Sequence, residues 1–296
     1  MELMLKNKWT IFLFIAPALL IYTIILFIPV VETVVTSFYQ WNIFSIDRNF
    51  IGIDNFIILF TRDEVFLTSI KNTFLLMLMS IITQIPAAVI LASILSTGVH
   101  GKKLFKTFYF VPNILSGAAI GLMWYFMYNS EFGLVNSFLR LIGLGSITRP
   151  WLGDEHTVLW AIILVACWQF VGYHMILFLS AIEGISASIN ESAIIDGAGR
   201  WRILWSITIP LIKPIIYVDA IMISTNSLKI FDLVYTLTAG QGGPNHASSV
   251  MALHMFINAF RNYRFGYASA IACVLLISCL IVTLLVNKIF KSESYD

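Results

Sequence analysis

Long apolar runs without charge constrain the fold of this chain more than any other feature of its sequence. The first of them, residues 11–31, contains 21 consecutive residues and no charged side chain. In an α-helix with a rise of 1.5 Å per residue, such a run is about 31 Å long, enough to cross a hydrocarbon core of about 30 Å. The sequence therefore predicts a membrane-spanning helix near its N-terminus.

The composition of the whole chain also indicates a membrane protein. Hydrophobic residues make up 59% and charged residues 11% of the sequence, whereas charged residues are about 25% of soluble domains. Because Lys6 and Lys8 precede the first run, a secretory signal peptide is the competing interpretation. The run exceeds the usual apolar core of a signal peptide, lacks a small-residue cleavage pattern and continues through Val34 and Val35, so we predict a retained span.

Six apolar stretches are long enough to cross a membrane as helices. They are residues 11–37, 69–96, 105–128, 157–182, 207–228 and 267–290. Three shorter stretches, at residues 50–60, 134–144 and 250–260, are expected as interfacial or extramembrane helices. No internal repeat or long linker divides the sequence. The predicted fold class is all-α, a polytopic membrane protein with about six transmembrane helices in a single domain over residues 1–296.

Basic residues near the spans predict the orientation in the membrane. An even number of spans places both termini on the same side. The short loop at residues 98–108 carries three lysines and no acid, and basic residues close to spans mark the cytoplasmic side. We therefore expect both termini, and the polar segment at about residues 183–206, to lie in the cytoplasm.

The polar segment 183–206 lies between two predicted spans. Ser186 or Ser188 can cap a short helix there, with Glu191 in or near its first turns. Asp196–Gly197 predicts a turn after that helix, because glycine tolerates a positive φ. Such a unit is either a loop with amphipathic helices on the membrane surface or a docking element for a soluble partner.

The order of residues in this segment favours the docking interpretation. Residues 191–198 read Glu-x-Ala-x-x-Asp-Gly-Ala, and Ile-x-Ile-Pro and a second proline follow. This pattern resembles the signature of permease subunits of bacterial ATP-binding-cassette (ABC) importers, except that Ser192 stands where most families of this kind have alanine. Further motifs match in order over nearly the whole chain, at residues 71–74, 111–113, 129–136, 237–244 and 266–270. The sequence is similar to the maltose-transporter-like permeases of the sugar importers.

The resemblance implies a type I ABC importer permease fold in a bacterial cytoplasmic membrane. In the family, this chain and a second homologous permease subunit would form the translocation path, above two ATPase subunits. An extracellular solute-binding protein would deliver a carbohydrate, and nucleic acid is not expected as a partner. The residues that would couple this chain to the ATPase are Glu191, Ser192, Ala193, Asp196, Gly197 and Ala198.

The chain carries no motif for catalysis of its own. It lacks Gly-x-x-x-x-Gly-Lys-Ser/Thr, so ATP and Mg²⁺ are expected on the partner ATPase and no cofactor on this chain. Residues 184–188 miss the final glycine of a nucleophile elbow, and no His-Glu-x-x-His occurs. The five histidines show no metal-ligand spacing. We therefore expect neither an enzyme nor a metal site.

A solute site is predicted from polar and aromatic residues inside the spans. Sugars are bound by polar groups that match their hydroxyls and by aromatic faces, in pockets that are otherwise apolar. The family pattern implies that Asn113, Gly117, Tyr173, Asn226 and Ser227 line such a cavity, with Gln169 as a neighbour. The alternative role for each is an interhelical hydrogen bond. Asp219 is expected to face the cavity or to pair with the partner permease.

Three other functions remain open from the sequence. An ABC importer permease could carry a non-sugar solute such as a polyol or a glycerol phosphate ester. A secondary sugar transporter is disfavoured by six spans without inverted halves and by the polar cytoplasmic segment. An intramembrane enzyme is disfavoured by the missing catalytic motifs.

Overall fold

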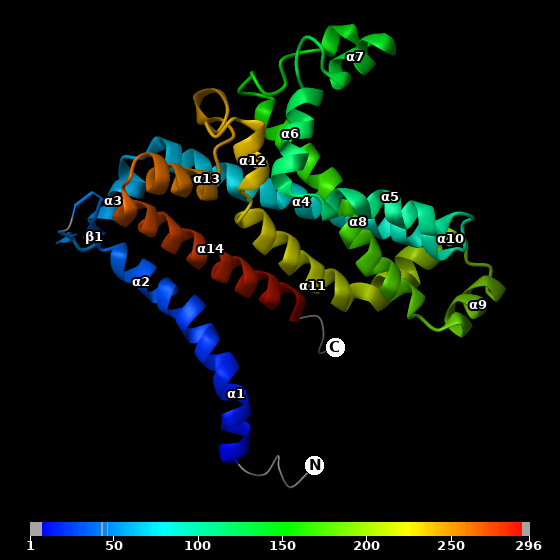
Figure 1. The fold of residues 1–296 in the computed structure, drawn as a ribbon. Coiled ribbons are helices and arrows are strands. Elements are labelled where there is room, and N and C mark those ends of the chain that lie inside the picture. Colours follow the sequence, from blue (N-terminus) through cyan, green and yellow to red (C-terminus); the bar gives the residue numbers. More distant parts are fainter. Residues whose placement is uncertain (1–7, 43, 46, 292–296) are drawn as a thin grey trace. The chain divides into compact units, whose positions relative to one another are not determined.

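The computed structural model describes residues 8–42, 44–45 and 47–291 of the chain (Figure 1). Helices dominate, with one two-stranded antiparallel sheet in which Tyr39 pairs with Phe50. The α-helices are α1 (Lys8–Tyr22), α2 (Ile28–Thr36), α3 (Asp54–Thr61), α4 (Glu64–Ser96), α5 (Lys102–Ile114), α6 (Gly117–Met127), α7 (Leu134–Leu141), α8 (Val158–Glu183), α9 (Ala187–Ile195), α10 (Arg200–Ile203), α11 (Ile209–Leu228), α12 (Asp232–Leu237), α13 (Met251–Phe256) and α14 (Phe265–Lys291). The strands are β1 (Tyr39–Gln40) and β2 (Asn49–Phe50).

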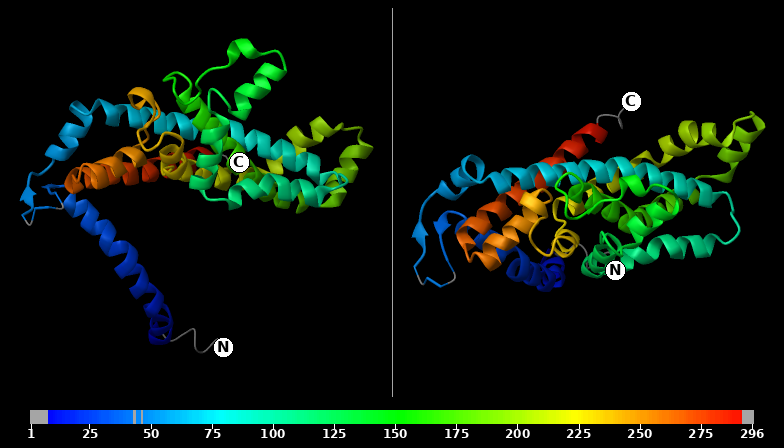
Figure 2. Two further views of the ribbon diagram at one scale, coloured as in Figure 1. Left: turned by 45° about the horizontal axis from the view of Figure 1, so that its top comes forward. Right: turned by 90° about the horizontal axis from the view of Figure 1, so that it is seen from above.

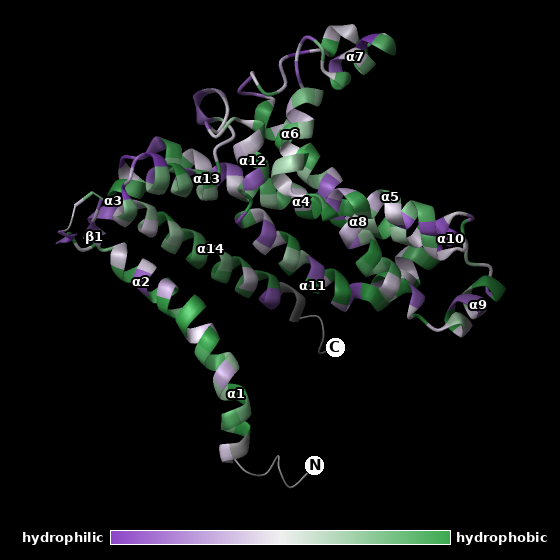
Figure 3. Cartoon of the chain, viewed as in Figure 1, coloured by the Kyte–Doolittle hydropathy of each residue, from purple (hydrophilic) through white to green (hydrophobic). Residues whose placement is uncertain are grey.

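Within the part of the chain that the structure describes, five helical segments are long and apolar enough to cross a membrane. They are Ile11–Thr36, Glu64–Ser96, Val158–Glu183, Arg200–Leu228 and Phe265–Lys288. Two of them run through short π-helical turns, at Thr23–Phe27 and Leu204–Thr208. Figure 3 shows the apolar colouring that continues along these helices. The prediction of an all-α polytopic membrane protein is confirmed.

The third predicted span, residues 105–128, is not one straight helix. It consists of α5 and α6, which meet at a bend of 99°. Leu115 and Ser116 between them have extended backbone, and the Ser116 hydroxyl accepts a hydrogen bond from the Ala119 N–H at 3.2 Å. A serine with this geometry starts a new helix, because it satisfies a backbone donor that has no partner within the helix. Hydropathy averaged over the stretch hides this break.

The structure divides into two compact units, 1–63 with 255–274 and 64–254 with 275–296. In the first unit, Asn55 donates from its amide to the carbonyl oxygens of Ser37 and Tyr39, at 2.8 and 3.1 Å. Gly266 lies so close to Tyr39 that an added Cβ would come within 1.9 Å of its carbonyl oxygen. These contacts join the hairpin, α3 and the start of α14 within this unit.

The second unit is built on the packing of α4 along α8, with α11 against both and α5 against α8 (Figure 2). Ala88, Val89 and Ala92 of α4 meet Met175, Phe178 and Leu179 of α8 in its apolar core. The small side chains of α4 allow the two helices to approach closely, as is common between membrane helices. This packing decides which face of each helix is turned inward.

Candidate functional site

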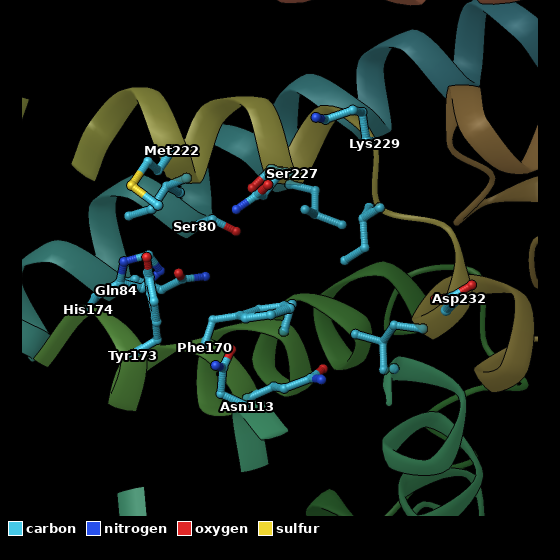
Figure 4. Close-up of a pocket in the computed structure, with 18 of the residues that line it drawn as sticks. Ser80, Gln84, Asn113, Phe170, Tyr173, His174, Met222, Ser227, Lys229 and Asp232 are labelled. Carbon is cyan, nitrogen blue, oxygen red and sulfur yellow. The ribbon is translucent and has the colours of Figure 1, made fainter. Parts of the chain in front are cut away.

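A cavity of about 510 Å³ lies in the second unit, among α4, α5, α6, α8, α11 and α12. All of the predicted solute-site residues line it, namely Asn113, Gly117, Gln169, Tyr173, Asn226 and Ser227. Figure 4 shows side chains from these helices converging on the same space. The structure therefore brings together residues that are more than one hundred positions apart in the sequence, and their role in binding stays a prediction.

The bend between α5 and α6 places Asn113 and Gly117 at the cavity. Asn113 is near the end of α5, and Gly117 is the first residue of α6. Gly117 also allows a close approach, because an added Cβ would come within 3.1 Å of the Asp232 Cβ. The broken third span thus exposes polar groups to the cavity where a straight apolar helix would continue.

Sequence reasoning missed the contribution of α4. Ser80 and Gln84 line the cavity and are almost fully buried, with 1% and 3% of their surface exposed. Together with Leu76 they repeat every four residues, so they share one face of the helix. That spacing of two polar residues within an apolar run is the signal that could have identified them.

Apolar and aromatic side chains complete the wall of the cavity. Phe170 and Phe231 contribute rings, and Met222 and Ile223 of α11 contribute aliphatic surface. The described lining includes one lysine and one aspartate, Lys229 and Asp232, and both lie at the edge of the cavity (Figure 4). Ten of the twenty lining residues have polar side chains, so the cavity combines apolar walls with converging polar groups, as small-molecule sites do.

Asp219 pairs with His174 inside the chain. The Asp219 Oδ1 lies 2.6 Å from the His174 Nδ1, and the two residues are 0% and 3% exposed. The sequence had suggested that Asp219 faces the cavity or a partner subunit, and the structure corrects this: Asp219 lies behind His174, which itself lines the cavity. A buried acid in a membrane helix needs such a partner, because an isolated charge there is costly.

Buried polar atoms without a hydrogen-bond partner gather near this cavity. Within the described residues they include Ser80 Oγ, Gln169 Oε1 and Asp219 Oδ2. Folded proteins rarely leave buried polar groups unpaired, so each such atom calls for an explanation. Ser80 and Gln169 belong to the lining of the cavity.

The predicted coupling segment, residues 183–206, contains α9 and α10. Gly197 follows α9 with a φ of +78°, which confirms the predicted turn. Ser186 takes the N-cap position of α9, but its hydroxyl pairs with the Ser188 hydroxyl at 2.8 Å and not with a backbone N–H. Glu191 is the fifth residue of α9, so it lies past the first turn.

The side chains of α9 present both polar and apolar groups at the surface. Of the predicted coupling residues, Glu191, Ser192, Asp196 and Gly197 are exposed, Ala198 is half-buried and Ala193 is buried. Ile194 and Ile195 are exposed by 63% and 85%. Lys102 of α5 forms an ion pair with Glu183 at the end of α8, which joins two helices at the start of the coupling segment. A surface helix with solvent-exposed isoleucines is suited to insertion in a groove of another protein.

A polar network joins α4 to the loop that follows α12. The Asn72 amide donates to the carbonyl oxygens of Ala247 and Ser249, both at 2.9 Å. The Thr73 hydroxyl accepts from the Met251 N–H at 3.0 Å. These contacts explain two polar residues of the 71–74 motif as structural groups that hold the loop.

The comparisons with known proteins agree with this architecture. Residues 55–292 match the family described as "Binding-protein-dependent transport system inner membrane component". The chain is 38% identical to the "Probable ABC transporter permease protein YurN" of Bacillus subtilis, over 97% of this chain and 98% of that protein. It is 33% identical to the "Multiple sugar-binding transport system permease protein MsmF" of Streptococcus mutans, over 96% of each chain.

A solved structure has the same fold. A chain from a bacterial ABC transporter involved in the import of the acidic polysaccharide alginate superposes with a TM-score of 0.84. It is 25% identical to this chain, and the match covers 98% of this chain and 97% of that one. The type I importer permease fold implied by the sequence motifs is thereby confirmed. This chain belongs to the family of inner membrane components of binding-protein-dependent transport systems.

Proposed function

We propose that this chain is the permease subunit of an ATP-driven importer for a sugar or oligosaccharide. The observation that carries the proposal is that the polar and aromatic residues of the spans line one cavity of about 510 Å³. Relatives named for multiple sugars and for alginate support a carbohydrate as the solute. As a multi-pass permease of this family, the chain has a transport role and is not an enzyme.

The cavity suits a hydroxyl-rich solute. Amide groups of Asn113, Gln169 and Asn226 can both donate and accept hydrogen bonds, as a sugar hydroxyl does. The aromatic rings of Phe170 and Tyr173 offer faces for the apolar side of a sugar ring. A second, homologous permease subunit would close the remaining sides and complete the translocation path.

ATP hydrolysis belongs to partner subunits in this proposal. The exposed α9 helix would dock on an ATPase subunit, one for each of the two permeases, and ATP and Mg²⁺ would be bound there. The coupling segment then lies in the cytoplasm together with both termini. The lysines of the 98–108 loop, Lys102, Lys103 and Lys106, lie on the same side, in agreement with the positive-inside rule. An extracellular solute-binding protein would deliver the sugar. The family description, which names transport that depends on a binding protein, supports this step.

Uptake by a reconstituted complex tests the proposal. The chain is purified with the permease, ATPases and binding protein encoded beside its gene, and the complex is placed in proteoliposomes with ATP inside. We expect uptake of a labelled sugar that requires ATP and persists when ionophores remove ion gradients. Uptake that follows an ion gradient without ATP would identify a secondary transporter and overturn the proposal. ATP-driven uptake of polyols or glycerol phosphate esters, with no sugar transported, would assign the non-sugar alternative.

A further inference from the structure

We propose that the cavity recognises its solute at a floor made by Ser80, Gln84, Gln169 and His174, and that this floor selects a neutral solute over an anionic one. This inference rests on the proposed function and names the class of solute. It adds to the sequence-predicted site two residues of α4 and the histidine that Asp219 holds.

The floor is formed by two adjoining helices. Ser80 and Gln84 are four residues apart on α4, and each lies on the face turned to the cavity. Gln169 and His174 come from α8, which packs along α4. Each of the four is exposed by no more than 3%. Polar groups this deep lose contact with bulk water, so they depend on hydrogen bonds inside the cavity.

Two polar atoms of the floor are available for hydrogen bonds to a ligand. Ser80 Oγ and Gln169 Oε1 have no hydrogen-bond partner within the described residues. The Ser80 hydroxyl can donate and accept, and Gln169 Oε1 accepts. A solute hydroxyl also donates and accepts, so it can satisfy both atoms. Gln84 has only a long contact from its amide nitrogen to the Cys167 sulfur, at 3.9 Å, and can turn to the same ligand.

Asp219 is a positioning residue for His174. The Asp219 Oδ1 lies 2.6 Å from the His174 Nδ1 and fixes that side of the ring. The other ring nitrogen, Nε2, is therefore the one available to a solute. Asp219 Oδ2 has no hydrogen-bond partner among the residues that the structure describes, and Asp219 is fully buried. The carboxyl group therefore sets the ring orientation from the side away from the solute.

The charges around the cavity disfavour an anion. The His174 ring is already paired with the Asp219 carboxyl group at 2.6 Å, so it is not a free cationic partner for a solute. The edge of the lining carries one basic and one acidic side chain, Lys229 and Asp232. Because the lysine and the aspartate are equal in number, the described lining offers no excess positive charge, and burying an anion without a counter-charge is costly. A uronate oligosaccharide or a phosphate ester therefore finds no lysine or arginine at the floor itself, whereas a neutral saccharide does not need one.

The first test compares solutes in the reconstituted complex. Lactose, raffinose and diacetylchitobiose serve as neutral probes, and an alginate pentasaccharide and glycerol 3-phosphate serve as anionic probes. We expect ATP-driven uptake of at least one neutral probe and of neither anionic probe. Uptake of an anionic probe at an equal or higher rate overturns the inference while leaving an importer in place. Absence of ATP-driven uptake for all five probes counts against the proposed function itself, and this inference falls with it.

The second test uses Ser80→Ala with Ser224→Ala as its control. Ser224 is also a buried serine of a spanning helix, but its hydroxyl donates to the Ala220 carbonyl at 2.6 Å and it does not line the cavity. We expect Ser80→Ala to raise the KM for the transported neutral probe about 2- to 12-fold, as the loss of one hydrogen bond implies. The melting temperature of the complex should not fall, because the hydroxyl has no protein partner to lose. Ser224→Ala should leave KM unchanged.

A purely structural role for Ser80 predicts that Ser80→Ala does not raise KM. In that case Ser80→Ala leaves KM at the wild-type value, whatever happens to the melting temperature, and Ser80 is not part of the binding surface. Gln169→Ala provides a second variant on the other helix, with the same expected rise in KM. If neither variant changes KM while ATP-driven uptake continues, the inference fails and the proposed function survives.

Discussion

At the scale of single residues, backbone geometry and side-chain chemistry can be separated in the coupling segment. Gly197 has a φ of +78°, and nothing lies within 4 Å of the position that a Cβ would take. Gly199 is equally open but has a φ of −72°, which any residue adopts. The requirement for glycine at position 197 therefore comes from the backbone conformation and not from lack of space.

Gly197→Val should impair the turn after α9, and Gly199→Val should be tolerated. A β-branched residue in the left-handed region costs about 1–2 kcal/mol or more, so the valine at 197 redirects the chain. The measurement is ATPase stimulation by sugar-loaded binding protein in nanodiscs, together with the amount of ATPase subunit that stays bound. Glu191→Ala should reduce stimulation less than Gly197→Val, because it removes one interfacial charge pair. Wild-type stimulation in both the 197 and 191 variants would contradict docking through α9.

Asn226→Ala should raise the KM for sugar uptake about 2- to 12-fold, because one hydrogen bond to a neutral hydroxyl is lost. Its neighbour Thr225 provides the control, since its hydroxyl donates to the Ile221 carbonyl at 2.9 Å within the same helix and it does not line the cavity. Thr225→Ala should keep the wild-type KM. Equal KM values for the two variants would remove Asn226 from the solute site.

At the scale of helices, one buried pair connects two of the elements that enclose the cavity. His174 lies on α8 and Asp219 on α11, and the two residues are 45 positions apart in the sequence. Each would be an unsatisfied polar group in a membrane helix without the other. The pair therefore constrains the rotation of both helices about their axes.

Asp219→Leu should destabilise the complex strongly, because it leaves His174 buried without its partner. Removing one member of a buried pair typically costs about 3–5 kcal/mol. The double variant Asp219→Leu with His174→Leu should recover much of the lost melting temperature, since apolar residues can replace a buried pair at little cost. Thermal unfolding of the single and double variants in detergent measures this coupling. Additive losses in the double variant would show that the two residues do not support each other.

The break between α5 and α6 is the element that sequence analysis did not anticipate. Residues 105–128 have the hydropathy of a single span, yet Ser116 starts a second helix at a bend of 99°. Pro112, Ser116 and Gly117 lie close together at this point, and each weakens a continuous helix. The signal was present in the residues, but averaging over the whole stretch concealed it.

At the scale of the whole molecule, membrane topology relates the cavity to the two surfaces. The proposed orientation places the coupling segment in the cytoplasm and the loop after α12 outside. Ser192 in α9 and Gln241 in that loop are both exposed, so cysteines at these positions report their side directly.

Ser192→Cys should react with a membrane-impermeant thiol reagent only in inside-out vesicles, and Gln241→Cys only in right-side-out vesicles. Both are made after the native Cys167, Cys273 and Cys279 have been replaced by alanine. The cysteine-free chain is the control for background labelling. The reverse pattern would invert the topology and exclude docking of α9 on a cytoplasmic ATPase.

The sequence by itself determined the properties that depend on local chemistry. Five spans form continuous helical segments whose ends lie within seven residues of the predicted ends, because apolar runs of this length with few charges are stable in a membrane. The turn at Gly197 was equally predictable, since glycine is the residue that enters a positive φ without strain. Polar residues inside the spans indicated a solute site because polar groups are expensive in lipid.

Only the tertiary structure decided which polar residues share the cavity. Ser80 and Gln84 resemble ordinary interhelical hydrogen-bonding residues in the sequence, and their direction depends on the rotation of α4 against α8. Asp219 could have faced a cavity or a partner subunit, and its position behind His174 follows from the packing of α11. Helix periodicity indicates which residues lie on one face, whereas the packing of side chains between helices determines where that face points.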